Sequence, residues 1–295
     1  MADPGQILDT CIAHVRRALP ELAIAMARLR SGEGQFNHVL VVNEQLIFRF
    51  PRAPQGAATL AGEVTLLPRL QGRLPLAIPK PVYRLTDPAT GELSAMGYAM
   101  IPGEPLGDEA LAAIRDEAAL DRMAGQLAGF LRALHRLPVD EVAPSATLPD
   151  VAAYWHQLHE AFQAELYHCM RPGAQRATDE LFAAILDDLC QRPPSPVLVH
   201  GDFGGANILY DPARFEITGV IDWGFAGPGD PASDIASLSC CGEDFLARGF
   251  GVYPEMAEML PRARRYRATF ALQQALYARR DGNREDFDDG IRDYV

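Results

Sequence analysis

Two polar segments in the second half of the chain combine residue types that phosphoryl transfer requires. They read HGDFGGAN over residues 200–207 and IDWG over residues 221–224. Transfer of a phosphoryl group to an alcohol needs a carboxylate that orients the attacking hydroxyl, and oxygen ligands that hold magnesium against the phosphates. We therefore take Asp202 as the candidate base, with Asn207 and Asp222 as the candidate magnesium ligands.

Asp and Asn also occur at strand ends simply as turn formers, which is their commonest use. The chain has only four Asn residues, at positions 37, 43, 207 and 283, so chance rarely places one five residues after an Asp. This rarity favours a chemical role for Asp202 and Asn207 over a turn-forming one.

The HGDxxxxN loop and the downstream IDWG segment resemble those of the aminoglycoside phosphotransferase family, whose fold is like that of protein kinases. The likeness extends over most of the chain. The segments LIFRFPR, GEVTLL, GYAMIPGEPL and GVIDWGFAGPGDPASDIASL look most like the 2''-aminoglycoside phosphotransferases, with some likeness to macrolide kinases. The resemblance implies an α+β, two-lobed protein-kinase-like fold, with a small antiparallel sheet lobe and a mostly helical large lobe.

Matched residue by residue, the resemblance implies that Asp202 is the catalytic base and that Asn207 and Asp222 bind Mg²⁺. It gives His200 a structural role in shaping the loop. Asp234 matches a family segment that braces the catalytic loop. These motifs are specific to the kinase-like superfamily and do not specify an antibiotic substrate.

A glycine-containing stretch near the amino terminus is the candidate phosphate lid. Gly32 and Gly34 alone would indicate only a turn, but a strand follows them, and a dinucleotide-binding turn would require a helix there. We interpret the stretch from Ser31 to Phe36 as a β-hairpin lid that presents backbone N–H groups to the phosphates.

Arg49 stands where the family commonly has the phosphate-binding Lys of its third strand, and Glu63 matches the salt-bridge partner of that Lys. Arg also binds phosphate, but its planar fork does not replace an ammonium directly. Composition is one reason for the Arg, since Lys80 is the only Lys in the chain. Because of this departure, a nucleotide-binding protein without catalytic activity is an alternative function. For Glu63, the alternative is a solvated residue on the helix surface.

The resemblance also places a hinge over residues 98–103, with the backbone of Ala99 and Ile101 bonding the purine. Tyr98 falls at the gatekeeper position, where a bulky side chain narrows the adenine pocket, so both ATP and GTP stay candidates. We therefore expect a nucleotide-binding lobe over residues 1–103, and a catalytic and substrate-binding helical lobe over residues 104–295.

Hydrophobic periodicity predicts the elements that carry these residues. In the first lobe it predicts a five-stranded sheet with one inserted helix: strands at 27–30, 39–42, 46–50, 81–85 and 97–101, and a helix over 57–70. In the second lobe it predicts helices over 120–137, 149–170 and 174–190 and from 231 onward, around a β segment spanning 197–221.

The charge is divided unevenly along the chain. Residues 1–103 carry 10 basic and 8 acidic side chains, whereas residues 104–295 carry 17 and 31, for a net charge of -12 overall. This balance argues against nucleic acid and anionic membranes as partners. The family resemblance implies that carboxylates near the carboxyl end bind a small cationic substrate, which makes Asp281 and Glu285 candidate contacts. Such an acidic run is otherwise commonly only a solvated face.

We therefore predict an O-phosphotransferase that uses Mg²⁺ to move the γ-phosphate of ATP or GTP to a hydroxyl of an aminoglycoside-like cationic molecule. A macrolide kinase, or a metabolite kinase of the choline or homoserine type, is the alternative. Five Cys without a CxxC pair, no export signal and no apolar run of about 20 residues lead us to expect a cytoplasmic protein.

Three further features are expected to be structural. His156 and His159 share a helix face without a third spaced ligand, so we expect a solvated face and no metal site. The adjacent Cys240 and Cys241 are expected to pack in the buried interior. Asp230, which precedes Pro231, is expected to act as an ordinary N-cap.

Overall fold

The computed structural model describes residues 3–30 and 37–295. The chain divides into two compact units. Unit 1 comprises Met1–Leu106 and Ala206–Ala226, and unit 2 comprises Gly107–Gly205 and Gly227–Val295. Unit 1 thus includes residues 206–226, which the linear division at residue 103 assigned to the second lobe.

The first part of unit 1 is a five-stranded antiparallel sheet with two helices. Its elements are α1 (Pro4–Ala18), β1 (Ala27–Leu29), β2 (Asn37–Val42), β3 (Leu46–Pro51), α2 (Pro54–Leu70), β4 (Tyr83–Thr86) and β5 (Leu93–Ala99). The strand order is β1-β2-β3-β5-β4. This order confirms the expected sheet with one helix inserted between its third and fourth strands.

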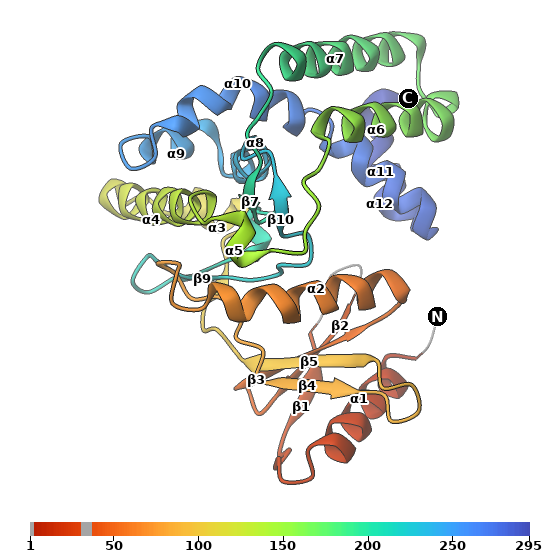
Figure 1. Ribbon diagram of the computed structural model, residues 1–295, viewed down its shortest axis with the longest axis vertical. Coiled ribbons are helices and arrows are strands. Elements are labelled where there is room, and N and C mark those ends of the chain that lie inside the picture. The colour runs from red at the N-terminus through yellow and green to blue at the C-terminus, as the bar shows by residue number, and fades with distance from the viewer. Residues whose placement is uncertain (1–2, 31–36) are drawn as a thin grey trace. The chain divides into compact units, whose positions relative to one another are not determined.

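Both faces of the sheet are buried at β3. Alternate residues of a strand point to opposite faces, so neighbouring residues of β3 contact different elements. In β3, Phe48 and Phe50 join Cys11 and Val15 of α1 in one buried cluster. Arg49 therefore points to the opposite face, where α2 packs against β3 and β5 (Figure 1). A single polar residue in an otherwise apolar strand is in this way aimed at a helix.

The second part of unit 1 is a small sheet of β6 (Glu104–Pro105), β8 (Ile208–Asp211) and β9 (Glu216–Val220), in the order β6-β8-β9. The Val220 amide donates to the Ala77 carbonyl over 2.9 Å. Gly219 makes this approach possible, since a Cβ there would lie 2.8 Å from the Ala77 oxygen. Backbone pairing thus attaches residues 206–226 to the first part of the chain.

Unit 2 is mostly helical, as the sequence predicted. Its helices are α3 (Asp108–Ala113), α4 (Glu117–His135), α5 (Val139–Val142), α6 (Val151–Glu165), α7 (Pro172–Gln191), α8 (Ala232–Leu238), α9 (Glu243–Arg248), α10 (Glu255–Arg267), α11 (Phe270–Asp281) and α12 (Arg284–Ile291). A two-stranded ribbon pairs β7 (Val197–Val199) with β10 (Gly227–Gly229). Along the part of the chain that the structure describes, no helix has the length and apolar character needed to span a membrane.

Candidate functional site

The loop that follows β7 carries the candidate base. His200 and Phe203 are fully buried, and Phe203 stacks on Phe130 of α4 with ring centroids 5.6 Å apart. The Asp202 amide donates to His200 Nδ1 over 3.3 Å. Burial of the residues on both sides fixes the loop while Asp202 itself stays exposed.

Asp234, on α8, binds the start of this loop through both carboxylate oxygens. The amides of His200 and Gly201 each donate to it over 2.9 Å. Asp234 is fully buried. Burial opposes its ionisation, but the hydrogen bond from His135 and the charges of both histidines hold the pKa of Asp234 below its usual value. An ionised acceptor at this point strengthens its hydrogen bonds to the loop.

His135 is a positioning residue that the sequence reasoning missed. Its Nε2 lies 3.0 Å from Asp234 Oδ2, and its Nδ1 lies 3.1 Å from the hydroxyl of Tyr253. His135 ends α4, the helix whose apolar face the sequence predicted, and it is buried on that face. The sequence signal that could have identified His135 is a polar residue next to Leu134 on the apolar face of this helix.

Asn207 and Asp222, the candidate magnesium ligands, belong to neighbouring segments of unit 1. The Ile221 amide donates to the Asn207 carbonyl over 2.9 Å, which aligns the residue before Asp222 with Asn207. Asp222 has φ 62, a left-handed conformation that few side chains adopt. Such strain often accompanies a functional position.

The donor chemistry of Asn207 and Asp222 fits magnesium. An amide and a carboxylate are hard oxygen ligands, and magnesium is usually bound by one or two carboxylates together with substrate phosphates. No three His, Cys, Asp or Glu side chains gather into a metal-binding group within residues 3–30 and 37–295. A magnesium site completed by phosphates does not require such a group.

Arg49 joins Glu63 and Asp222 through two ion pairs. Its Nη1 lies 2.7 Å from Glu63 Oε2, and its Nη2 lies 2.8 Å from Asp222 Oδ1. Arg49 is 5% exposed and Glu63 1%, so the alternative of a solvated Glu63 is wrong. The structure thereby brings together three predicted site residues separated by 14 and 173 positions in sequence.

The environment of this cluster shifts its titration. Burial raises the pKa of Glu63 to about 7, with Asp222 adding to the rise and Arg49 opposing it. Burial also opposes the charge of Arg49, yet the two carboxylates raise the pKa of the guanidinium. Arg49 is therefore charged at every physiological pH, whereas Glu63 titrates near neutrality.

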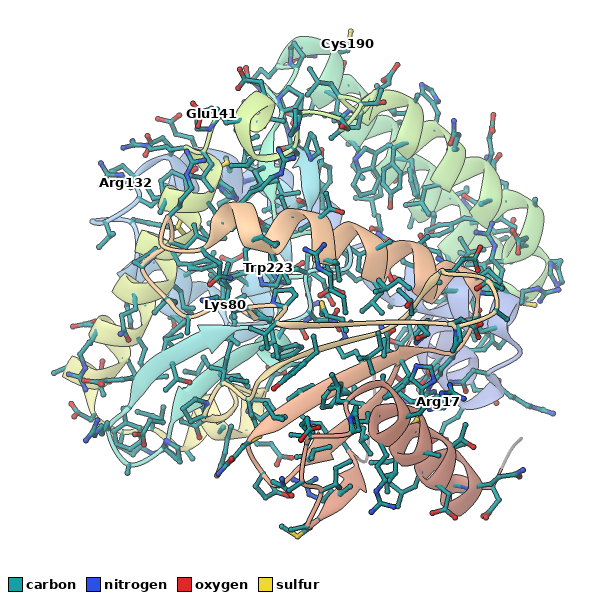
Figure 2. All side chains as sticks on the ribbon, turned by 60° about the horizontal axis from the view of Figure 1, so that its bottom comes forward. Arg17, Lys80, Arg132, Glu141, Cys190 and Trp223 are labelled. Atoms are coloured by element: carbon teal, nitrogen blue, oxygen red, sulfur yellow. The ribbon has the colours of Figure 1, made fainter. Side chains whose placement is uncertain are left out.

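The IDWG segment packs against α2. A Cβ on Gly224 would lie 3.4 Å from Thr59 Cβ and 3.5 Å from Glu63 Oε1. Figure 2 shows Trp223 beside α2, and Trp223 is 1% exposed. A large buried side chain and a Gly in close contact together hold the backbone next to Asp222.

The hinge candidates lie at and after the carboxyl end of β5, an interior strand of the same sheet. Tyr98 pairs with Ile47 across β5 and β3, so its side chain shares the face of Arg49. Tyr98 is 5% exposed, and burial raises its pKa to about 12. Ala99 ends β5, and Ile101 follows two residues later. The lid candidates Ser31, Gly32 and Gly34 lie outside the residues that the structure describes.

Asp281 and Glu285, the candidate substrate contacts, lie at the turn between α11 and α12. Both are exposed. The adjoining surface hollow, of about 190 Å³, is lined by Arg279 and Arg284 among others. Cations are thus interspersed with these acids, so the turn is less negative than its acid count suggests.

The structure also tests the structural roles expected for Asp230, His156 and His159. Asp230 Oδ1 accepts from the Ala232 amide over 2.9 Å, but the N-cap of α8 is Pro231, so Asp230 is not the ordinary N-cap that was expected. His156 is exposed, but the expectation of a solvated face is wrong for His159. Its ring stacks on Phe182 at 4.5 Å, and Nε2 lies 2.8 Å from Asp179 Oδ1.

The adjacent Cys240 and Cys241 belong to a 3-10 helix, Ser239–Cys241, that follows directly on α8. Their Sγ atoms are 4.0 Å apart. Both side chains are only partly buried, so the expectation that they pack in the interior is wrong.

Comparison with known proteins finds similar sequences over most of the chain. A family model described as "Phosphotransferase enzyme family" matches residues 27–281. Viomycin phosphotransferase of Streptomyces vinaceus is 34% identical over 296 residues, covering 98% of this chain and 99% of that protein. Aminoglycoside 3'-phosphotransferase of Streptomyces fradiae is 32% identical over 187 residues, covering 63% of this chain and 66% of that protein.

The solved structures extend the likeness to the fold. The GDP complex of wild-type aminoglycoside 2'-phosphotransferase-IIIa matches with a TM-score of 0.88 at 25% identity. The match covers 96% of this chain and 95% of that chain. It confirms the predicted α+β, two-lobed, kinase-like fold class.

Proposed function

The chain belongs to the phosphotransferase enzyme family, and from this premise we propose that it moves the γ-phosphate of ATP or GTP to a hydroxyl of a cationic, aminoglycoside-like molecule. The observation that carries the proposal is the buried bridge of Arg49 to Glu63 and Asp222. It supplies a fixed positive charge beside a candidate magnesium ligand, and phosphoryl transfer depends on that kind of electrostatic arrangement.

In the proposed mechanism, Asp202 accepts a hydrogen bond from the acceptor hydroxyl and takes its proton as the oxygen attacks phosphorus. The exposure of Asp202 suits a group that must reach a substrate. Asp234 keeps the loop in place by holding the amides of His200 and Gly201. Asp202 thus transfers the proton, while Asp234 positions the loop through its backbone amides.

Asn207 and Asp222 would hold Mg²⁺, which when bound neutralises the charge of the phosphates. Arg49 orients Asp222 and is itself oriented by Glu63. The Arg replaces the Lys expected from the resemblance, and it retains contacts with both carboxylates. This retention supports an active enzyme over a nucleotide-binding protein without catalysis.

The proposed substrate class rests on charge and on the relatives. Residues 104–295 carry 17 basic and 31 acidic side chains, a surplus that favours cations. The similar proteins are named for the antibiotics viomycin and aminoglycosides. Because the donors are nucleotides, we place the reaction in the cytoplasm.

The test uses purified protein with Mg²⁺, ATP or GTP, and a panel of aminoglycosides, viomycin, macrolides, choline and homoserine. Mass spectrometry should show a product heavier by one phosphoryl group with a cationic antibiotic. Asp202→Asn should lower turnover by about 10²–10⁴-fold, the usual contribution of a general base. Asp187→Asn, at an exposed site on α7, is the matched control. Undiminished turnover in Asp202→Asn would remove Asp202 from the role of base.

A further inference from the structure

A buried set of ion pairs in unit 2 is centred on Arg262 of α10. Its Nε lies 2.6 Å from Asp188 Oδ2 on α7, and its Nη1 lies 3.1 Å from Oδ2 of Asp230, which lies between β10 and α8. Its Nη2 donates to the Arg192 carbonyl at the end of α7. The side chain of Arg262 is 14% exposed, and those of both carboxylates are 4% exposed. Each nitrogen of one guanidinium thus contacts a different group.

Asp230 is held by further bonds besides the one from Arg262. Its Oδ2 also accepts from the hydroxyl of Tyr266 over 2.8 Å, and its Oδ1 accepts from the amide of Ala232, the first residue of α8. The Asp230 carbonyl accepts from the amide of Ser233 over 3.0 Å and from its hydroxyl over 2.8 Å. One residue therefore connects two side chains of α10 to the first turn of α8.

The first turn of α8 also holds the candidate catalytic loop. Asp234 lies four residues after Asp230, about one helical turn away, and accepts from two backbone amides of the loop that carries Asp202. Because α8 has only seven residues, a displacement at its start moves Asp234 with it. A continuous path of bonds within unit 2 therefore runs from Arg262 to this loop.

The chemistry of these contacts favours a role in placing α8. Replacing a buried ion pair with apolar side chains is often neutral or stabilising, so such a pair is weak evidence of stabilisation. A guanidinium presents its N–H donors in a rigid planar fork, and a hydrogen bond requires its donor and acceptor to be aligned. The bonds of Arg262 therefore fix the start of α8 in position and in direction relative to the end of α7, which apolar packing alone would not do.

We propose that Arg262 is a positioning residue for phosphoryl transfer: through Asp230 and α8, it places the loop that carries the candidate base. Its effect on turnover rests on the proposed function, whereas its effect on the loop does not. A displacement of about 1 Å in a reacting group can lower the rate about 10²-fold. The candidate nucleotide contacts belong to unit 1, so loss of Arg262 should lower kcat without weakening nucleotide binding.

The first test measures the loop in the absence of any reaction. Arg262→Met keeps much of the side-chain volume but removes the donors to both carboxylates. Hydrogen exchange at the two loop amides bound to Asp234 should become about tenfold faster, the factor expected for one weakened hydrogen bond, while exchange in α11 stays unchanged. Arg264→Met, which breaks an exposed pair with Glu243 on the same helix, is the matched control and should change neither. Equally faster exchange throughout unit 2, or loop amides that exchange as in wild type, would overturn the proposal.

Tyr266→Phe tests the same path with a smaller disturbance. The ring can keep its stacking on Trp155, at 4.3 Å between centroids, and only the hydroxyl that donates to Asp230 is lost. Exchange at the two loop amides should become about two- to threefold faster. This variant decides the matter if Arg262→Met does not fold, because unchanged loop amides in Tyr266→Phe would also contradict the proposal.

The second test measures turnover, at a temperature where circular dichroism shows each variant folded. Arg262→Met should lower kcat about 10- to 10²-fold and leave the KM for ATP or GTP within about twofold of wild type. Arg262→Lys should recover part of kcat, since an ammonium still reaches one carboxylate. A raised nucleotide KM at unchanged kcat would remove Arg262 from the positioning role. If the exchange results hold while no acceptor is phosphorylated, Arg262 still places the loop and only the proposed function fails.

Discussion

Units 1 and 2 hold their candidate site residues by different forces. In unit 1, charged side chains contact one another, with Arg49 bound to both Glu63 and Asp222. In unit 2, Asp202 is exposed, and its loop is held by backbone amides that donate to Asp234. We infer that removing a charge disturbs unit 1 most, whereas removing a hydrogen-bond acceptor disturbs unit 2 most.

The largest effect on stability is expected from Arg49→Met. The substitution keeps much of the side-chain volume but leaves Glu63 and Asp222 without their cation. Because the Arg49–Glu63 pair is buried, we expect the free energy of unfolding to fall by about 3–5 kcal/mol. Urea denaturation followed by circular dichroism measures this loss.

Arg49→Lys is the matched variant, because it keeps the charge and loses only the forked geometry. It should lower the free energy of unfolding by only about 1 kcal/mol, since one ammonium can still reach a carboxylate. Equal losses for Arg49→Met and Arg49→Lys would mean that shape, and not charge, holds the cluster in unit 1.

A smaller loss is expected from Asp234→Asn in unit 2. The amide nitrogen that replaces one oxygen cannot accept from the loop backbone, so a buried donor loses its partner. The expected fall in the free energy of unfolding is about 1–3 kcal/mol. Asp187→Asn, exposed on α7, should change it by less than about 0.5 kcal/mol.

A second readout distinguishes a positioning role for Asp234 from general destabilisation. Hydrogen exchange should accelerate at the amides of His200 and Gly201 before it does elsewhere in unit 2. If exchange rises uniformly over α4 and α7 instead, Asp234 supports the whole unit and not the loop in particular.

Sequence reasoning was most successful where signals are local. The short apolar segment at residues 46–50 predicted the strand that carries Arg49, and the short connections between strands predicted an antiparallel sheet. The loop around Asp202 could be located because its residue types and spacing lie within one short segment. The resemblance to a known family supplied the pairing of Arg49 with Glu63, which strand and helix periodicity alone would not have linked.

Long-range contacts were less accessible from the sequence. The bond of His135 to Asp234 spans 99 positions, and no spacing rule connects them. Likewise, residues 206–226 belong with unit 1 through a backbone hydrogen bond to Ala77, and backbone pairing of this kind leaves little mark on side-chain types. Glu63 could be placed on α2 but not on its buried face, since its burial depends on the position of Arg49.

Glu63 of unit 1 and Asp234 of unit 2 should change the free energy of unfolding in opposite directions as the pH rises. The raised pKa of Glu63 means that the folded chain retains a proton, between about pH 4.5 and 7, that the unfolded chain has lost. The stability contributed by Glu63 is therefore present below pH 4.5 and is lost as the pH rises through 7. The lowered pKa of Asp234 gives a contribution present above pH 3.8 and lost as the pH falls through the folded value.

Urea titrations at a series of pH values test this contrast. Relative to wild type, Glu63→Gln should become progressively more stable between pH 5 and 8, because it has no proton to lose. The deficit of Asp234→Asn should shrink as the pH falls from 3.8 through the lower folded value, because the unfolded wild-type chain is protonated first and the folded carboxylate after it. Curves for the two variants that run parallel to wild type would show that neither carboxylate has the titration assigned to it.

The smallest effects are expected at Asp281 and Glu285. Both are exposed, so the double variant Asp281→Asn with Glu285→Gln should change the free energy of unfolding by less than about 0.5 kcal/mol. If these acids contact a cationic substrate, the variant should raise KM about two- to fivefold at unchanged kcat, because exposed charge pairs contribute little. Asp187→Asn with Glu180→Gln, both exposed on α7, makes the same change in net charge and should leave KM unchanged. An equal rise in KM for both double variants would show that the acidity of the second part of the chain attracts the substrate only as a diffuse field, without a contact at the α11–α12 turn.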